Sequence, residues 1–392
     1  MKTIEEIDLD SKRVLIRCDL DVPMNEDGTI ADDHRIKAAI SSIEYLLKKN
    51  AKVIIAGHMG RPGGKAVSSL SLKPVADRIS LLLRTPVKFL SDCVGDEVTR
   101  NISSIKNGEI VLLENVRFHE GEENNDPSFS KNLASLCDVY VNNAFATAHR
   151  AHASTAGIAN YVSVKAAGFT LRDEVNYFNK SCKNPERPLL AIFGGAKVST
   201  KIKAIKNVGK SADVVIIGGA MANTFLKAKG HSIGNSLFEE DLLSVATDTL
   251  KWFQENDKQL LLPIDVITSS KLATGVPTSI CEISAIPDGM LALDIGPKSL
   301  QLFKAAINSA KTIIWNGPMG VFEIPEYSAG TFGIVDALSE ANALTVVGGG
   351  DTDLALNQRN AFDKMDFVST AGGAFMALLE GKTLPALSAL EM

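Results

Sequence analysis

Residues 344–352 have the sequence Leu344-Thr345-Val346-Val347-Gly348-Gly349-Gly350-Asp351-Thr352. A short apolar run that ends in glycine is typical of a buried strand leaving a sheet. The three glycines expose backbone N–H groups and let a ligand come close. Asp351 offers a carboxylate to a magnesium ion, and Thr352 or Asp353 is suited to capping a following helix. A plain strand-to-helix turn capped by Asp351 would share this pattern, so the rest of the chain has to decide between the two interpretations.

Apolar runs of three to five residues recur along the chain and alternate with longer amphipathic segments. The apolar runs lie at residues 14–16, 53–56, 110–113, 139–141, 189–193, 214–217, 259–262, 312–315 and 345–347. The amphipathic segments lie at residues 35–48, 72–83, 131–136, 199–208 and 238–254. Strands alternating with helices predict βαβ units, parallel sheets and an α/β fold. Ligands of such sheets bind outside the carboxyl ends of the strands.

The length of 392 residues favours two domains. A boundary is expected between about Ala167 and Pro188. There an amphipathic helix over 168–183 is followed by the proline-bounded linker 183–188. Two α/β halves joined by a helix would leave a cleft between them.

Composition excludes several classes of protein. A net charge of −5 gives no global basic field for nucleic acid. The five cysteines are scattered without a CxxC pair, which argues against a disulfide framework or a structural zinc site and fits a reducing cytosol. No apolar run approaches the ~18 residues of a membrane span, and the N-terminus lacks the apolar core of a signal peptide. A cytoplasmic protein is therefore expected.

Charged side chains follow the predicted strands of the first half. They are Asp19, Asp21, His58, Arg61, Arg117, His119, His149, Arg150 and His152. Arginine binds phosphate or carboxylate as a bidentate fork, so four such sets predict an anion site. Surface salt bridges and buried histidines are the alternative for any one of these residues. A metal role for His58 is disfavoured because no HxH or HExxH spacing occurs.

The strand ends of the second half carry glycines and lysines instead. Gly194-Gly195-Ala196-Lys197, Gly218-Gly219-Ala220 and Asn316-Gly317-Pro318-Met319-Gly320 each follow an apolar run. Lys197 and Lys201 are four residues apart and are expected on one face of the helix that opens there. Lysine in a first helical turn opposes the helix dipole, which suggests that a ligand phosphate belongs beside it. Two solvated surface lysines are the alternative.

The common nucleotide fingerprints are absent. No GxxxxGK[ST] sequence occurs, no strand is followed by GxGxxG with an acid about 20 residues on, and the protein-kinase motif set is missing. P-loop, dinucleotide-binding and protein-kinase folds are therefore not expected.

Nine motifs in order nevertheless resemble the phosphoglycerate kinase family, from about Arg13 to Ala386. They are residues 17–23, 57–62, 113–117, 142–150, 194–201, 218–221, 315–323, 348–352 and 369–374. The resemblance implies two Rossmann-like domains with parallel sheets flanked by helices. It places a 3-phosphoglycerate domain at 1–167, an interdomain helix and hinge at 168–188, a nucleotide domain at 189–370, and a segment returning to the first domain at 371–392. It also implies a monomer, while the net charge and the lack of a long apolar run argue against nucleic-acid and membrane partners.

The activity implied by the resemblance is Mg²⁺-dependent phosphoryl transfer between ATP and the carboxylate of 3-phosphoglycerate, giving ADP and 1,3-bisphosphoglycerate in glycolysis and gluconeogenesis. The triose positions would be Asp19, Asp21, Arg35, His58, Arg61, Arg117 and Arg150. The nucleotide positions would be Gly195, Lys197, Lys201, Gly218, Gly219, Asn316, Pro318, Glu323, Gly348, Gly349, Gly350, Asp351 and Thr352. Asp351 would orient the metal-bound phosphates and Glu323 would accept from the ribose hydroxyls. Arg35, Lys197, Lys201 and the helix start at Gly372-Gly373 would stabilise the transferred phosphoryl group across a closing hinge.

The residues themselves agree with this chemistry. A carboxylate acceptor is already ionised at pH 7, so no general base is needed, and none is evident. Four positions depart from the family pattern: Asp21 replaces the usual asparagine, Asn143 an aspartate, Ala146 a glycine, and Ala371 the first glycine of its motif. Alanine restricts the backbone, so the donor geometry near these positions is in question.

Two other classes of function fit parts of the sequence. A two-domain binding protein that closes on a small anion would need the arginines, but not Asp351, Lys197 and Lys201 together. A dehydrogenase is disfavoured by the missing dinucleotide fingerprint.

Overall fold

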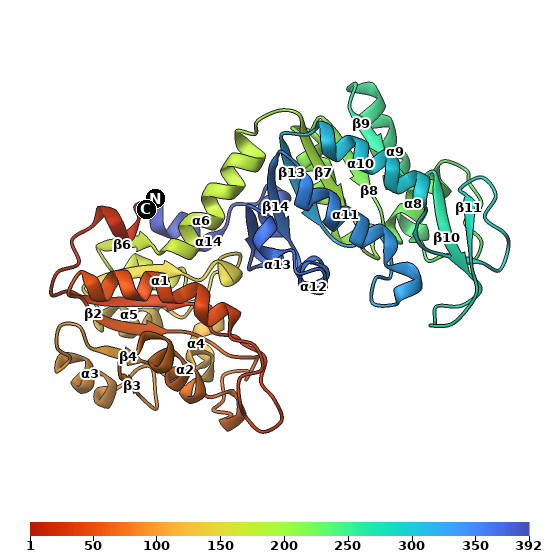
Figure 1. The fold of residues 1–392 in the computed structure, drawn as a ribbon. Coiled ribbons are helices and arrows are strands. Elements are labelled where there is room, and N and C mark those ends of the chain that lie inside the picture. Colours follow the sequence, from red (N-terminus) through yellow and green to blue (C-terminus); the bar gives the residue numbers. More distant parts are fainter. Residues whose placement is uncertain (392) are drawn as a thin grey trace. The chain divides into compact units, whose positions relative to one another are not determined.

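The computed structural model describes residues 1–391, which fold into two compact units (Figure 1). The first unit runs from Met1 to Val175 and takes in the chain again from Thr383 onward. The second unit is Asn176–Lys382. The chain therefore rejoins the first unit later than residue 371, because helix α13 (Gly372–Leu379) packs on helix α7 (Ile202–Gly209) of the second unit.

A six-stranded parallel sheet forms the centre of the first unit, in the order β3-β4-β2-β1-β5-β6. The strands are β1 (Arg13–Cys18), β2 (Lys52–Ala56), β3 (Val87–Phe89), β4 (Ile110–Leu112), β5 (Val139–Asn143) and β6 (Val164–Ala167). The inner strands are buried nearly throughout, as expected for a sheet covered on both faces. The predicted runs of the first half are thus confirmed, whereas the edge strands β3 and β6 were not predicted.

Helices and 3₁₀ turns connect these strands. They are η1 (Ile4–Glu6), α1 (His34–Lys48), η2 (Ser68–Leu70), α2 (Lys73–Leu83), α3 (Asp96–Ser103), η3 (Val116–Phe118), α4 (Glu120–Glu123), α5 (Pro127–Ser135), η4 (Phe145–Thr147), η5 (Gly157–Asn160), α6 (Phe169–Phe178) and α14 (Pro385–Glu391). The apolar faces of α1 and α2 pack on β1 and β2 to form one core. Helix α6 contains the division between the two units.

A second parallel sheet, ordered β15-β14-β13-β7-β8-β9, forms the centre of the second unit. Its strands are β7 (Leu189–Phe193), β8 (Val214–Ile217), β9 (Gln259–Leu261), β13 (Thr312–Asn316), β14 (Leu344–Gly348) and β15 (Phe367–Ser369). Five of the six strands fall on predicted apolar runs. Strand β14 is the run that leads into the three glycines, so its prediction as a buried strand is confirmed.

The other helical elements of the second unit are η6 (Asn179–Lys183), η7 (Val198–Thr200), α8 (Met221–Ala228), η8 (Glu240–Leu242), α9 (Leu243–Glu255), α10 (Pro297–Ser309), η9 (Pro325–Tyr327), α11 (Ala329–Glu340), α12 (Gly350–Gln358) and η10 (Phe362–Lys364). Buried residues of α10, α11 and α12 pack on β7, β13 and β14. The helix predicted over 168–183 ends as an α-helix at Phe178 and continues as the π-helical turn η6.

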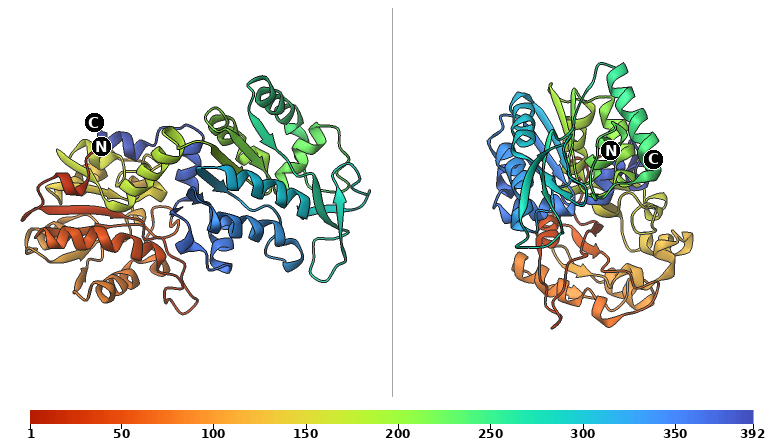
Figure 2. Two further views of the ribbon diagram at one scale, coloured as in Figure 1. Left: turned by 45° about the horizontal axis from the view of Figure 1, so that its top comes forward. Right: turned by 90° about the vertical axis from the view of Figure 1, so that its right-hand side faces the viewer.

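A three-stranded antiparallel sheet in the second unit was not predicted. Strands β10 (Asp265–Ser269), β11 (Thr278–Glu282) and β12 (Leu291–Ile295) pair in the order β11-β10-β12, and Figure 2 shows them in teal, beside the parallel sheet of their unit. Strand β11 is mostly exposed, so it has no apolar run by which the sequence could reveal it. No helix within residues 1–391 is both long enough and apolar enough to cross a membrane.

Candidate functional site

Four neighbouring strands of the first unit end beside the predicted anion site. Asp19 follows β1, His58 follows β2, Arg117 lies in η3 after β4, and Arg150 lies after β5. Because these strands are parallel and adjacent, their carboxyl ends share one edge of the sheet. The fold therefore places residues that are far apart in the sequence on one edge.

Arg17 and His58 form the buried base of this cluster. Arg17 is fully buried; its Nε donates to Ser154 Oγ at 2.8 Å, and its Nη2 lies 3.0 Å from His58 Nδ1. Burial, followed by the charges of Arg17 and Arg117, holds the pKa of His58 well below its usual range. His58 is therefore neutral at pH 7, with Nδ1 accepting from Arg17 and the proton on Nε2.

The two aspartates after β1 have different surroundings. Asp19 is buried and Oδ2 accepts from Ala146 N at 2.8 Å, while burial raises its pKa. Asp21 Oδ1 accepts from Gly60 N at 2.8 Å, and Oδ2 lies 3.7 Å from His58 Nε2. Arg35, at the start of α1, donates to the backbone oxygen of Asp21 at 2.8 Å.

The remaining arginines of the site differ in burial. Arg117 is 3 % exposed, donates to Gly60 O at 2.7 Å, and lies 3.4 Å from Glu123 Oε1. Burial is the main cause that lowers the pKa of Arg117. Arg150 is half-buried, and Arg61 is exposed. Arg17 and Arg117 are thus both desolvated; Arg17 is held by Ser154 and His58, whereas Arg117 has the Glu123 carboxylate nearby.

The departures from the family pattern occupy different environments. Asn143 Oδ1 accepts from Ser42 Oγ and Thr170 N, whereas Asp21 bonds with Gly60. The carboxylate gained at Asp21 and the carboxylate lost at Asn143 therefore concern different hydrogen-bond partners. Ala371 has a φ of −138°, so alanine is accommodated there without left-handed strain.

In the second unit, four adjacent strands end in the glycine-rich turns. Asn316 at the end of β13 donates through Nδ2 to Gly348 O at the end of β14, at 2.5 Å. Gly195 N donates to Pro318 O at 2.8 Å, which joins the turns after β7 and β13. A Cβ on Gly219, which has a φ of +67°, would lie 2.5 Å from the backbone of Gly195. The turns therefore pack so closely that this position requires glycine.

Lys201 lies in the middle of these turns. Its ammonium donates to Gly194 O at 2.8 Å and to Asn316 O at 3.0 Å. Burial lowers its pKa to about 8, and Asp351 opposes this effect. Two of the three ammonium hydrogens are used within the described chain, and the third remains for a ligand oxygen.

The prediction that Lys197 and Lys201 share a face of the first helical turn is wrong. Lys197 has an extended backbone, and residues 198–200 form the 3₁₀ turn η7. Lys201 then precedes α7 as its N-cap. Lys197 is exposed, as is Glu323.

The helix after the three glycines is capped differently from the prediction. Gly349, with a φ of +116°, is the N-cap of α12, so neither Asp351 nor Thr352 nor Asp353 caps this helix. Thr352 is instead buried and donates back to the backbone oxygens of Gly348 and Gly349. Asp351 in the first turn is exposed. A Cβ on Gly372 would lie 3.7 Å from Gly349 Cα, so the N-termini of α12 and α13 lie side by side.

Sequence reasoning did not assign a role to the buried network that supports the arginines. Glu122 is fully buried and accepts from Ser154 Oγ at 2.6 Å and from Ser154 N at 2.8 Å. Ser154 in turn accepts from Arg17. An arginine within the apolar strand β1 was the only sequence signal of this network.

Comparisons with known proteins give one family. A family model described as "Phosphoglycerate kinase" matches residues 4–382. The chain is 48% identical to "Phosphoglycerate kinase" of Desulforapulum autotrophicum over the whole of both chains, and 47% identical to that of Aquifex aeolicus over all of this chain and 98% of the relative. The structure titled "Structure of phosphoglycerate kinase from Coxiella burnetii" superposes with a TM-score of 0.93 at 41% identity, covering 99% of this chain and 98% of that one.

Proposed function

This chain is a glycolytic kinase of the phosphoglycerate kinase family, which transfers phosphate between ATP and 3-phosphoglycerate, and we propose that its first unit binds 3-phosphoglycerate and its second unit the nucleotide. The single observation that carries this division is the contrast between the two sheet edges. One has desolvated arginines at its strand ends, and the other has glycine turns around Lys201.

In the first unit, the triose would be held by the arginines and by His58. Arg117 and Arg17 are buried beside the strand ends, where a guanidinium attracts an anion more strongly than in water. Neutral His58 has its Nε2 proton available as a hydrogen-bond donor. Asp19, Asp21, Arg35, Arg61 and Arg150 are proposed to complete the site. The carboxylate that accepts the phosphoryl group needs no general base.

In the second unit, the phosphates would meet Lys201 and two helix N-termini. Helices α12 and α13 begin side by side, and the free N–H groups of a first helical turn favour anions. Gly372 and Gly373 supply such groups without a side chain in the way. Lys197 and Glu323 are exposed. We propose that Lys197 contacts the γ-phosphate and that Glu323 contacts the ribose.

The nucleotide is proposed to carry Mg²⁺ held by Asp351. The donor set fits this ion, since Mg²⁺ binds through one or two carboxylates together with substrate phosphates, and Asp351 is an exposed carboxylate in the first turn of α12. When bound, the ion would neutralise phosphate charge. Lys201, the backbone N–H groups and Arg35 would orient the transferred group and exclude water around it.

Transfer requires the two ligands to approach each other, so we propose that the units close by a hinge around residues 168–188. We also propose that the enzyme is a cytoplasmic monomer that binds neither nucleic acid nor membranes. The net charge of −5 supports the absence of a nucleic-acid interface.

A coupled assay tests the division into sites. It links consumption of ATP and 3-phosphoglycerate to reduction of 1,3-bisphosphoglycerate. Arg117→Ala should raise the KM for 3-phosphoglycerate about 10- to 100-fold with little change in the KM for ATP. Glu323→Gln should raise only the KM for ATP. If each variant affected the other substrate, the assignment of ligands to units would be rejected.

The same assay tests the metal ligand. Asp351→Asn should raise the Mg²⁺ concentration needed for half-maximal rate, whereas Asp353→Asn, two residues further along the same helix, should leave it unchanged. Equal Mg²⁺ dependence in Asp351→Asn and wild type would remove Asp351 from the metal site.

A further inference from the structure

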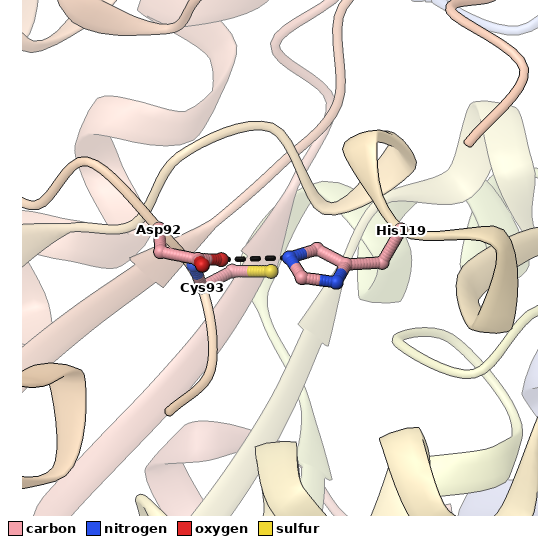
Figure 3. Close-up of side chains that lie close together, drawn as sticks. All are labelled: Asp92, Cys93 and His119. Atoms are coloured by element: carbon pink, nitrogen blue, oxygen red, sulfur yellow. Dashed lines mark hydrogen bonds and ion pairs between the residues drawn. The ribbon is translucent and has the colours of Figure 1, made fainter. Parts of the chain in front are cut away.

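Three potential metal ligands of the first unit meet outside both sites described above. Asp92 and Cys93 lie in the loop between β3 and α3, and His119 lies between η3 and α4. One donor atom of each lies within 4.8 Å of the other two. Figure 3 shows the carboxylate, the thiol and the imidazole converging, with a dashed line between Asp92 and His119.

We propose that Asp92, Cys93 and His119 form a binding site for a thiophilic divalent cation of the zinc class. Oxygen, sulfur and nitrogen donors together match the ligand set of Zn²⁺. Magnesium prefers all-oxygen coordination, so this cluster would select a different ion from the one carried by the nucleotide.

The distances suit such an ion. Zn–N and Zn–S bonds of about 2.0–2.3 Å in a tetrahedron put donor atoms about 3.3–3.8 Å apart. The donors therefore need to contract only modestly from their 4.8 Å limit. His119 Nε2 and Asp92 Oδ1 are 2.7 Å apart, so this pair would separate slightly as both turn to the metal.

The surrounding structure already orients the side chains of Asp92 and His119. Asp92 Oδ1 accepts from Cys93 N at 2.6 Å, and the His119 ring stacks on Phe129 with centroids 5.2 Å apart. Cys93 is fully buried, whereas the side chains of Asp92 and His119 are 50% and 33% exposed. A metal would enter from the solvent side and keep water on its open position, as it does at sites with three protein ligands.

The local charge favours a cation. The carboxylates of Asp92, Glu122 and Glu114 lie close enough to Cys93 for their negative charge to act on its sulfur. Their negative field attracts a divalent ion, which would displace the Cys93 thiol proton to solvent and have its charge balanced by Asp92 and the Cys93 thiolate.

Cobalt spectroscopy on the full-length, metal-free protein tests the proposal without reference to activity. Wild type titrated with Co²⁺ in the absence of nucleotide should bind one ion with thiolate-to-cobalt charge-transfer absorption, and Zn²⁺ should displace it. Cys93→Ser should abolish the absorption. His119→Gln and Asp92→Asn should each weaken Co²⁺ binding about tenfold or more.

Two matched controls separate this site from others on the chain. Cys182→Ser and His231→Gln remove the same kinds of ligand elsewhere and should leave the titration unchanged. A large excess of Mg²⁺ should not displace Co²⁺. Because Cys93 is buried, circular dichroism has to show that Cys93→Ser is folded; if it is not, the half-buried His119 carries the test.

Either of two outcomes would overturn the proposal. One is the absence of charge-transfer absorption in wild type at saturating Co²⁺, which would leave Asp92–His119 as an ion pair above an inert thiol. The other is an equal affinity in wild type, His119→Gln and Asp92→Asn, which would mean adventitious binding only.

Discussion

The ammonium of Lys201 is held within the turns of the second unit, because it donates hydrogen bonds to Gly194 O and Asn316 O. Lys201→Ala should lower kcat about 10²–10³-fold while changing the KM for ATP much less, since charge on the transferred group is stabilised mainly in the transition state. Lys203→Ala, on the exposed side of α7, is the matched control. Steady-state kinetics with both substrates saturating measure kcat. A loss confined to KM would demote Lys201 to a binding role.

The pKa of Lys201 predicts an alkaline limit on activity. Burial lowers this pKa to about 8, so the free enzyme carries the charge below pH 8 and loses it as the pH rises through 8. The kcat/KM for ATP, which reports the free enzyme, should therefore fall above pH 8. Lys201→Arg should move this fall to higher pH, because arginine stays charged. The free energy of unfolding changes in the opposite direction. Between pH 8 and 10.5 the folded state binds fewer protons at Lys201 than the unfolded state, so the free energy of unfolding rises with pH over this range.

Asp21 adds a carboxylate beside an anionic ligand. Asp21→Asn should lower the KM for 3-phosphoglycerate, because asparagine can keep the bond from Gly60 N while the negative charge is removed. Glu26→Gln removes an exposed charge nearby in the sequence and should have no effect. An unchanged or raised KM in Asp21→Asn would reject the idea.

At the residue scale, the sequence predicts which types of side chain gather but not their state. The arginines and His58 were identified because they follow apolar runs. Buried Arg17 is hydrogen-bonded to Ser154, which in turn bonds to Glu122, and both residues are over 100 positions away from Arg17 in the chain. The low pKa of His58 depends on its burial and on Arg17 and Arg117, which come from other strand ends. Hydrogen bonds of this range have no local signature.

Close packing of the strand-end turns is the feature of the second unit that should be most sensitive to added bulk. Gly219→Ala would put a Cβ 2.5 Å from the Gly195 backbone, so the turn after β7 has to move. We expect a higher KM for ATP and a lower melting temperature. Gly230→Ala is a control with a similarly positive φ of +89° and nothing within 4 Å, and it should cost only the backbone strain of about 1–2 kcal/mol. Equal effects of the two changes would mean that strain, not the clash, is responsible.

At the element scale, prediction succeeded where burial on both faces produced unbroken apolar runs. It failed for β11, whose side chains are mostly exposed, and for the turn between Lys197 and Lys201. Residues 199–208 have helical periodicity, yet Ser199 is held by Glu239, because both Ser199 Oγ and Ser199 N donate to the Glu239 carboxylate. A contact with another segment thus decided the backbone there.

The first unit depends on a helix from the far end of the chain. Ala386 N donates to Ala148 O, and α14 packs on η5 and β6. Leu390→Ala should lower the free energy of unfolding of this unit by about 2 kcal/mol, whereas Leu387→Ala, less buried on the same helix, should cost less. Amide hydrogen exchange in β1 and β6 measures this. Both tryptophans, Trp252 and Trp315, lie in the second unit, so the unfolding transition followed by tryptophan fluorescence should not change in Leu390→Ala. An equal shift of that transition would mean that the two units unfold together.

At the scale of the whole molecule, two α/β units could be expected from length and alternation of elements. The residue at which the chain returns could not, because α13 and α14 are both apolar and only packing assigns α13 to α7 and α14 to η5.

The late return of the chain also has a consequence for protein synthesis. Helix α14 begins at Pro385, and 385 − 175 = 210 residues separate it from Val175, where the first long segment of the first unit ends. At translation rates of about 5–20 residues per second, that interval lasts on the order of 10–40 seconds. During it, the surface over η5 and β6 lacks its cover. The second unit, a single continuous segment, can fold before the first unit is complete, so a nascent chain should present this uncovered surface to chaperones until α14 leaves the ribosome.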